Sequence, residues 1–277
     1  SACSAKEVEQ FLSHLAVQRN NSVSTQRTAL NALVFLFREF LEQPLDELSF
    51  EMARKPRRLP TVFTHDEAKA VINGLEGAPQ LVARLMYGSG LRINEALRLR
   101  VKDVDFGMQQ IIVRSGKGNK DRTTLLPDSL AEPLTLQIDA CLVQHKKDLA
   151  GGHGEVYMPF SLNQKYPSGG KEPAWQYLFP AAKLSMDPRS GVLRRHHLLD
   201  RGVQRAIGLA IREAGVYKQA NSHAFRHSFA TRLLENGYDI RTIQKLLGHA
   251  DVRTTEIYTH VVRKGGFGVR SPIDDTF

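Results

Sequence analysis

One stretch near the carboxyl end of the chain decides the fold, and it reads Ser222-His223-Ala224-Phe225-Arg226-His227-Ser228. Arg226 follows His223 by three residues, so a helix over this stretch would present both side chains on one face. Farther along, the chain reads Leu247-Gly248-His249 and then Thr255-Glu256-Ile257-Tyr258-Thr259-His260. With one more arginine from upstream, side chains of these types at these spacings can gather a phosphodiester and attack it.

That arginine and a lysine lie far upstream. The segment Gly90-Leu91-Arg92-Ile93-Asn94-Glu95 follows a glycine-containing break. We therefore expect Arg92 in the first turn of a helix, where free backbone N–H groups and the helix dipole favour an anion. Residues 110–114 and 122–126 are short β-like runs that predict a hairpin. Lys117 lies between two glycines and is expected at the tip of this hairpin.

These residues follow one another in the order Arg92, Lys117, His223, Arg226, His249 and Tyr258. The order and the spacing resemble the catalytic set of the tyrosine recombinases, which cut and rejoin DNA through a covalent phosphotyrosine. The resemblance extends from about Ala5 to Tyr258. Any one of these residues alone is more often structural or solvent-exposed, so the hypothesis rests on the complete set.

The resemblance implies how the phosphate is held and which cofactors are needed. Arg92 and Arg226 match the two arginines that clamp the scissile phosphate. A planar guanidinium suits this role because it can hold two oxygens and keeps its charge. Arginines also supply the charge neutralisation that metal ions supply in many phosphoryl-transfer enzymes, so no metal and no other cofactor is expected.

The resemblance also implies which groups move protons and attack the phosphate. His223 matches a histidine that contacts the phosphate and assists proton transfer, and His249 matches the second histidine of the family. Tyr258 matches the nucleophile. Lys117 matches the hairpin lysine that protonates the leaving 5′ oxygen.

Three neighbours of the matched residues have no direct role in the family's motif. Glu95 is interpreted as a helix-surface or buried charge partner rather than as a base. His227 and His260 are interpreted as structural residues.

The composition favours a folded protein with a polyanionic partner. The 277 residues are enough for one large or two modest domains, and a hydrophobic content of 42% can supply a core. A net charge of +9 suits DNA, although charge alone is weak support. Two cysteines are too few for a disulfide framework. No apolar run approaches the ~18 residues that span a bilayer, and no apolar leader opens the chain, so we expect no membrane partner and a cytoplasmic, nucleoid-associated location.

The chain divides at a basic segment that reads Arg54-Lys55-Pro56-Arg57-Arg58-Leu59-Pro60. Its prolines forbid a continuous helix and its cations prefer water or phosphate, so it is either an interdomain linker or a solvated basic loop. We expect residues 1–55 to form a helical core-binding domain of the SAM-like type, with helices over about 6–16 and 24–41. The family's N-terminal arm normally has four helices, so this domain is expected to be truncated or unusually small.

Residues 56–277 are expected to form the catalytic domain. A capping box at Thr64 and Glu67 predicts the start of its first helix. Apolar periodicity predicts further helices over 79–87, 92–99, 129–149, 201–214, 223–236, 240–247 and 254–260. The expected fold class is mainly α with a small antiparallel β-sheet, a tyrosine recombinase catalytic domain preceded by a small helical DNA-clamp domain.

An irregular stretch over about 151–198 is much longer than the ~12–15 residues usual for a structureless connection. It contains Leu162-Asn163-Gln164-Lys165-Tyr166-Pro167, Trp175-Gln176-Tyr177-Leu178-Phe179-Pro180 and Arg194-Arg195-His196-His197. Xer-type and phage-type members have only a brief connection here. These motifs, and the ending Gly268-Val269-Arg270-Ser271-Pro272, resemble those of integron integrases. Those enzymes recombine gene-cassette sites and take the cassette site as a folded single strand whose unpaired bases protrude.

We call the stretch over about 151–198 the insertion and expect it to contact such bases. Exposed bases stack on aromatic rings, while cations hold the adjoining DNA backbone. The candidate DNA contacts within it are Tyr166, Trp175, Arg194, Arg195, His196 and His197. The alternative is that Trp175, Leu178 and Phe179 form a small satellite core, with Tyr177 as part of it.

The leading hypothesis is a site-specific recombinase of the integron type, which integrates or excises gene cassettes through a 3′-phosphotyrosyl intermediate. Its expected partners are DNA, as folded single-stranded cassette sites and as duplex attachment sites, and further copies of the chain in a tetramer on DNA. One alternative is a Xer-type or phage-type recombinase of duplex sites with an unrelated insertion. Another is a non-catalytic architectural DNA-binding protein. A type IB topoisomerase shares the chemistry, but the insertion and the small N-terminal arm do not suggest one.

Overall fold

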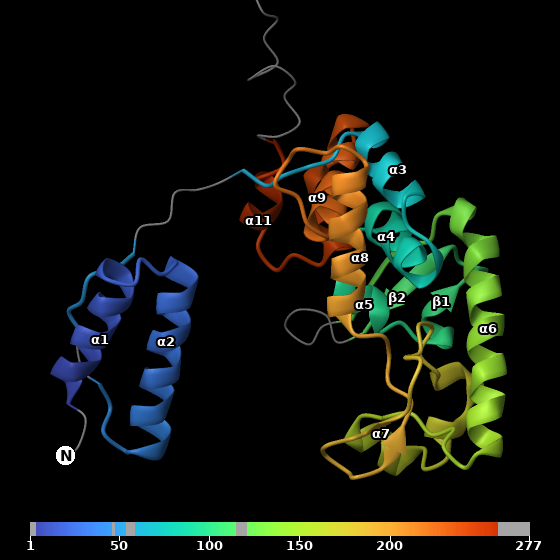
Figure 1. Ribbon diagram of the computed structural model, residues 1–277, viewed down its shortest axis with the longest axis horizontal. Coiled ribbons are helices and arrows are strands. Elements are labelled where there is room, and N and C mark those ends of the chain that lie inside the picture. Colours follow the sequence, from blue (N-terminus) through green and yellow to red (C-terminus); the bar gives the residue numbers. More distant parts are fainter. Residues whose placement is uncertain (1–3, 46–47, 54–58, 115–120, 260–277) are drawn as a thin grey trace, which may run out of the picture. The chain divides into compact units, whose positions relative to one another are not determined.

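The computed structural model describes residues 4–45, 48–53, 59–114 and 121–259 (Figure 1). The chain forms two compact units, residues 1–58 and residues 59–277. The described residues are mainly helical, and the second unit adds two small antiparallel sheets. The predicted fold class is confirmed.

The N-terminal unit is a helical hairpin of α1 (Ala5–Val17) and α2 (Val23–Phe35), which continues into the π-helical turn η1 (Leu36–Phe40). Its buried apolar residues are Val8, Leu12 and Phe37. The buried side-chain amide of Gln26 donates to a main-chain carbonyl of α1 and to the carbonyl of Glu51. This amide therefore ties the segment that returns after the hairpin to the hairpin itself.

The second unit begins as the sequence predicts. The Thr64 hydroxyl accepts the N–H of Glu67, and the Glu67 carboxylate accepts the N–H of Thr64, so the predicted capping box starts the first helix. Gly90 ends the second helix in a left-handed conformation, and Arg92 precedes the third. These helices are α3 (His65–Asn73), α4 (Gly77–Ser89) and α5 (Ile93–Leu97).

Helix α4 contacts α3, α5 and two later helices, α8 (Asp200–Glu213) and α9 (His223–Glu235). Further helices of this unit are α6 (Ala131–Ala150), α10 (Ile240–Leu247) and α11 (Arg253–Glu256). The last of these is shorter than the predicted 254–260, because the N–H of Tyr258 bonds to Thr255, three residues back, and tightens the turn. None of the described helices is both long enough and apolar enough to cross a membrane.

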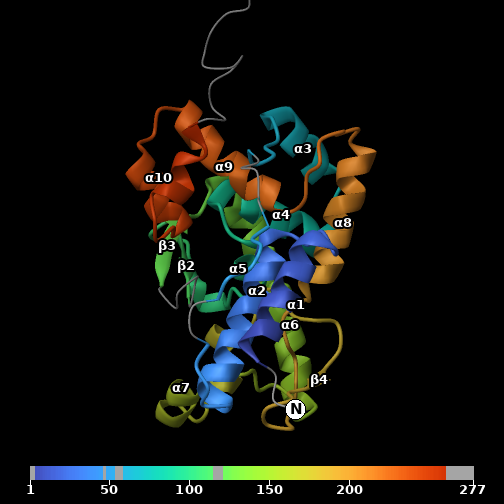
Figure 2. The same cartoon turned by 90° about the vertical axis from the view of Figure 1, so that its left-hand side faces the viewer.

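The predicted hairpin is present and gains a third strand. The sheet has the order β1 (Val104–Asp105), β2 (Gln110–Val113) and β3 (Arg122–Leu125), all antiparallel, with the 3-10 turns η2 (Val101–Asp103) and η3 (Asp128–Leu130) on either side. Val113 pairs with Arg122, which fixes the register where the hairpin opens. β3 packs against α10 (Figure 2). Lys117 lies outside the described residues.

The insertion is structured and lies at the carboxyl end of α6 (Figure 1). It comprises α7 (Phe160–Lys165), η4 (Gly169–Lys171), η5 (Pro173–Trp175) and the two-stranded sheet of β4 (Ser185–Met186) and β5 (Leu193–Arg194). The proposed satellite core is wrong in one respect: Leu178 and Phe179 belong to the main core of the unit. The reason is that Leu178 returns beside Leu99 and donates its N–H to the carbonyl of that residue.

Candidate active site

Arg226 is the centre of the site. It lies on α9, and only 3% of its side chain is exposed. One terminal nitrogen donates to the carbonyl of Gly90, just after α4. The other donates to the carbonyl of Leu247 at the end of α10 and lies 3.1 Å from Nε2 of His249. Arg226 therefore joins three segments that are far apart in the sequence, and its guanidinium is held in place before any ligand binds.

Two glycines allow these close approaches. Gly90 has a φ of 66° and Gly248 a φ of 64°, a region that residues with a side chain rarely occupy. A Cβ on Gly90 would lie 2.5 Å from the ring of Phe229. A Cβ on Gly248 would lie 2.5 Å from Cδ of Arg122. Both turns therefore require glycine for their conformation and for the space around them.

A single carboxylate, that of Glu95, lies among three arginines. It accepts the backbone N–H of Arg92 at 2.8 Å and the Arg92 guanidinium at 2.7 Å. Arg122 donates to both of its oxygens, at 3.0 and 2.7 Å, and Arg226 lies 3.7 Å away. The prediction that Glu95 is a buried charge partner is confirmed. Arg92 is the N-cap of α5 rather than a residue of its first turn, and the anionic group that its N–H binds is the Glu95 carboxylate.

The cluster of Glu95 and the three arginines carries a net positive charge. Burial alone would raise the pKa of Glu95, but hydrogen bonds and charge from Arg122, together with the Arg92 N–H and the charge of Arg226, lower it to about 2. Burial and the neighbouring Arg92 lower the pKa of Arg226 to about 9. At neutral pH three cations therefore face one anion, and the excess positive charge favours a phosphodiester.

The two predicted histidines are neutral at physiological pH. Burial and Arg226 lower the pKa of His223, and burial with Arg226 lowers that of His249 to about 3. An arginine can only donate, so Nε2 of His249 accepts from Arg226. Its proton then lies on Nδ1, which donates to Thr255 Oγ1 at 3.0 Å. His249 is therefore oriented by a partner on each side of the ring.

Tyr258 is buried, with 1% of its surface exposed, in a cluster of α9 and α10 residues. Its hydroxyl lies 2.9 Å from Nδ1 of His227, and its ring is stacked 6.5 Å from that of His249. Burial raises the pKa of Tyr258. His227, predicted to be structural, thus contacts the predicted nucleophile.

Two residues of this site were missed by sequence reasoning. His227 follows His223 by four residues, and their rings lie 6.1 Å apart on one face of α9, so the helical spacing was a usable signal. Arg122 carries no such signal, because its partners Glu95 and Leu246 come from other elements. His260 lies outside the described residues.

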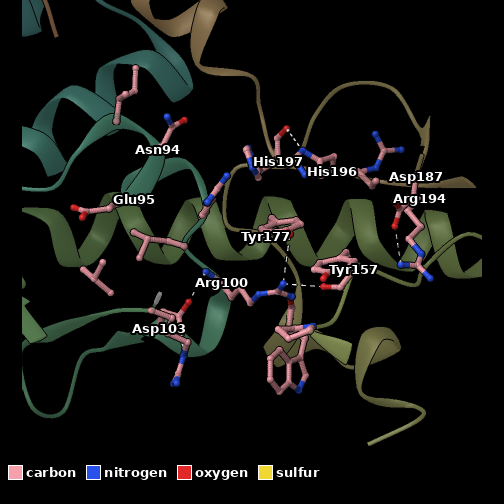
Figure 3. Close-up of a pocket in the computed structure, with 18 of the residues that line it drawn as sticks. Asn94, Glu95, Arg100, Asp103, Tyr157, Tyr177, Asp187, Arg194, His196 and His197 are labelled. Atoms are coloured by element: carbon pink, nitrogen blue, oxygen red, sulfur yellow. Dashed lines mark hydrogen bonds and ion pairs between the residues drawn. The ribbon is translucent and has the colours of Figure 1, made fainter. Parts of the chain in front are cut away.

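A cavity of about 1040 Å³ extends from Arg92 to the insertion (Figure 3). At one end it is lined by Arg92, Glu95 and His223. At the other end the lining includes Trp175, Tyr177, Arg194, Arg195, His196 and His197. Of the predicted DNA contacts in the insertion, only Tyr166 is not part of this lining. The structure thus brings Arg92, His223 and most of the predicted insertion contacts to one cavity.

The aromatic residues of the insertion pack around Arg100 (Figure 3). This arginine is buried and donates to the carbonyls of Trp175 and Tyr157, at 2.6 and 2.8 Å. Its guanidinium lies 4.6 Å from the ring centre of Tyr177. Lys102 covers the ring of Trp175. Both rings therefore already have cationic partners within the chain.

The two arginines predicted as DNA contacts are engaged in ion pairs within the chain. Arg194 lies 2.8 Å from Glu155 and 3.2 Å from Asp187, and Arg195 donates to both oxygens of Asp148. Their phosphate contacts stay predictions, and in the structure these side chains fasten the insertion together.

The two histidines predicted as DNA contacts differ from each other. His197 is 7% exposed, and burial lowers its pKa to about 4, while its Nδ1 donates to the carbonyl of Leu198 at 2.7 Å. His196 is exposed, and its ring lies 5.6 Å from that of Tyr177. His196 is therefore the more accessible of the two for a base.

Comparisons with known proteins show which family the chain belongs to. The model of the phage integrase family matches residues 61–264, and that of the N-terminal SAM-like domain of phage integrases matches residues 1–47. An integrase/recombinase of Escherichia coli is 51% identical over 98% of this chain and 80% of its own length. The tyrosine recombinase XerD of Mycobacterium tuberculosis is 34% identical, over 87% of this chain and 70% of its own.

Solved structures show the same fold. The crystal structure of XerA recombinase has a TM-score of 0.51 at 28% identity and covers 93% of this chain and 79% of its own. XerH bound to its difH substrate has a TM-score of 0.59 at 24% identity, covering 93% of this chain and 67% of its own, which is a likeness of fold. With the family model matched over most of its length, the chain belongs to the phage integrase family of tyrosine recombinases, enzymes that transfer DNA strands.

Proposed function

We propose that this enzyme recombines gene cassettes, taking the cassette site as a folded single strand and the attachment site as duplex DNA. The observation that carries the proposal is the cavity that joins Arg92 and His223 to the aromatic residues of the insertion. A strand whose scissile phosphate binds at the arginines would pass this insertion. An extruded base would then meet Trp175 and the exposed ring of His196.

The proposal assigns a role to each matched residue. Arg92 and Arg226 clamp the scissile phosphate, and His223 and His249 contact it and assist proton transfer. Tyr258 attacks the phosphorus and forms the 3′-phosphotyrosyl intermediate. Support comes from the convergence of these side chains on Arg226, a relationship that the spacing alone does not supply. Lys117, outside the described residues, is proposed on its sequence match to protonate the leaving 5′ oxygen.

The two parts of the chain have different proposed roles. Residues 1–55 act as a helical clamp on DNA, and residues 56–277 carry the chemistry, with residues 151–198 as the insertion. A tetramer would hold two DNA sites together for exchange. The match of residues 1–47 to a SAM-like integrase domain supports the first of these assignments.

A second candidate function is recombination of ordinary duplex sites. It is favoured by the internal contacts of the insertion, where Arg194 and Arg195 pair with carboxylates and His197 is buried. If the insertion serves only to make these internal contacts, it is a structural addition that does not bind an extruded base.

A covalent trapping experiment separates these functions. The enzyme is incubated with a nicked suicide form of a folded single-stranded cassette site, and in parallel with the perfect duplex of the same sequence. A covalent adduct that forms faster with the folded strand supports the proposal. Preference for the duplex supports the second candidate, and no adduct with either DNA supports an architectural protein. Tyr258→Phe is the control for the identity of the nucleophile.

A further inference from the structure

We propose that His227 is a catalytic residue, the group that takes the proton from the Tyr258 hydroxyl when DNA is cleaved and returns it when DNA is rejoined. The inference rests on the proposed role of Tyr258 as nucleophile. His227 lies beside the matched histidine and arginine of α9, and the motif of the family gives it no role.

The geometry is that of a nucleophile and its base. Nδ1 of His227 lies 2.9 Å from the Tyr258 hydroxyl, within the range in which a proton can be handed over. The two rings are 5.6 Å apart, and Tyr258 is buried, so bulk water has little access to its hydroxyl. His227 is therefore the neighbour that can accept this proton directly.

The surroundings of His227 keep its imidazole in the neutral form. The charged and titratable groups around it are His223 and Arg226 on its own helix, with Tyr258 and His249 facing it from beyond α10. Burial and the first two of these groups lower the pKa of His227 to about 4. The imidazole is thus neutral at physiological pH, with one ring nitrogen free of a proton.

The reaction balances with this assignment. The O–H bond of Tyr258 breaks and its proton passes to Nδ1 of His227, while the oxygen forms a bond to the scissile phosphorus. The bond from phosphorus to the 5′ oxygen breaks, and that oxygen takes the bonding electrons and a proton from the general acid proposed above. In rejoining, a 5′ hydroxyl gives its proton to that same group and attacks the phosphotyrosine. The tyrosine oxygen then leaves with the proton stored on His227.

A pair of substrates separates proton transfer from structural support. The first is the nicked suicide DNA, in which Tyr258 must attack. The second is a strand that ends in a 3′-(4-nitrophenyl) phosphate, offered with a 5′-hydroxyl strand. Nitrophenolate is a good leaving group without a proton. This joining is therefore compared in a Tyr258→Phe background, where the tyrosine cannot displace nitrophenolate and the reaction needs only the phosphate pocket.

The informative variant is His227→Asn, whose amide can keep the hydrogen bond but is not a base. We expect it to cleave the suicide DNA about 100-fold more slowly than the unaltered enzyme, with a rate that rises as pH rises, and to join the nitrophenyl substrate within about twofold. His65→Asn is the matched control, because Nδ1 of His65 lies 3.1 Å from the Tyr87 hydroxyl away from the predicted catalytic residues. It should leave both reactions unchanged.

Three outcomes overturn the inference. If His227→Asn cleaves at the rate of the unaltered enzyme, no proton passes through His227. Equal loss of both reactions would make His227 a structural support. An adduct formed by Tyr258→Phe would show that the nucleophile itself is wrongly assigned, which is a failure of the proposed function and is recognised separately from the behaviour of His227.

Discussion

Arg122 and Glu95 meet in a two-pronged ion pair, with nitrogen–oxygen distances of 3.0 and 2.7 Å, although one residue lies on a strand and the other on a helix. Both side chains are 10% exposed. Arg122 also donates to the carbonyl of Leu246, beside the carbonyl of Leu247 that Arg226 holds. The two arginines thus fix consecutive carbonyls immediately before Gly248 and His249. The pair therefore connects the β2–β3 hairpin, Arg92 and the turn at Gly248 and His249.

Replacement of Glu95 by Gln should destabilise the protein in a pH-dependent way. The pKa of Glu95 is lowered from 4.5 to about 2, so its ionised form contributes stability above pH 4.5 that is lost as the pH falls towards 2. We expect Glu95→Gln to lower the free energy of unfolding by about 3 kcal/mol at pH 7. The difference between the two proteins should shrink below pH 4.5 in urea titrations.

The control for this measurement is Glu213→Gln, at an exposed position on α8. It should change the free energy of unfolding very little at any pH. A difference for Glu95→Gln that stays constant down to pH 2 would show that the carboxylate charge is not what stabilises this cluster.

Replacement of Arg122 by Lys should slow cleavage while DNA binding changes little. A lysine keeps the charge but cannot hold both Glu95 oxygens and the Leu246 carbonyl in one plane. We expect a loss of about 10-fold in the single-turnover rate on suicide DNA. The exposed Arg253→Lys is the control. Unchanged cleavage by Arg122→Lys would mean that the histidine turn is held without this bond.

Replacement of Arg226 by Lys should nearly abolish cleavage. The lysine cannot donate to Gly90 and Leu247 while it also presents two nitrogens to a phosphate. We expect the rate on suicide DNA to fall at least about 100-fold. Arg232→Lys, at an exposed position on the same helix, should retain the full rate. Similar rates for the two variants would remove Arg226 from the proposed clamp.

Replacement of Trp175 by Ala should weaken binding to a bulged hairpin by ~1–3 kcal/mol and leave affinity for the unbulged duplex nearly unchanged. Stacking needs an extruded base, and a continuous duplex presents none without the cost of unstacking it. Both affinities must be measured at one salt concentration, because phosphate contacts respond to salt. Tyr166→Ala tests the other predicted aromatic contact, which is 47% exposed and not part of the cavity lining.

The outcome that contradicts this prediction is equal weakening on both DNAs, or a lowered melting temperature of the free Trp175→Ala protein. Either result would assign the ring to packing against Arg100 and Lys102.

The helices and the hairpin were predictable because their signals are local. The capping box at Thr64 and the β-like runs around Lys117 lie within a few residues of the elements that they define. The convergence of Arg92, His223, Arg226, His249 and Tyr258 followed from a resemblance to a whole set, and their spacing alone would not have shown it. The early end of α11 was missed, because one tighter hydrogen bond at Tyr258 decides where this helix ends.

The remaining features depend on contacts between distant parts of the chain. Arg122 and Leu246 are 124 positions apart, and Arg195 and Asp148 are 47 apart. An arginine that pairs with a carboxylate of the protein cannot be told from one that binds a phosphate by its sequence alone. That is why Arg194 and Arg195 suggested DNA contacts, and why Arg122 suggested nothing.

The position of Arg100 has a consequence for engineering. The insertion rejoins the main domain at Tyr177 and Leu178, where Tyr177 pairs with Arg100 in a β-bridge. The carbonyls of Trp175 and Tyr157 accept hydrogen bonds from the Arg100 side chain, although Arg100 precedes the whole insertion in the chain. A graft of residues 151–198 onto a recombinase with a short connection would therefore leave out the anchor of the transplanted segment. Arg100, with Asp103 accepting its backbone N–H, would have to be transferred as well. The segment that must be transferred is therefore discontinuous in the sequence, because it includes Arg100 and Asp103 as well as residues 151–198.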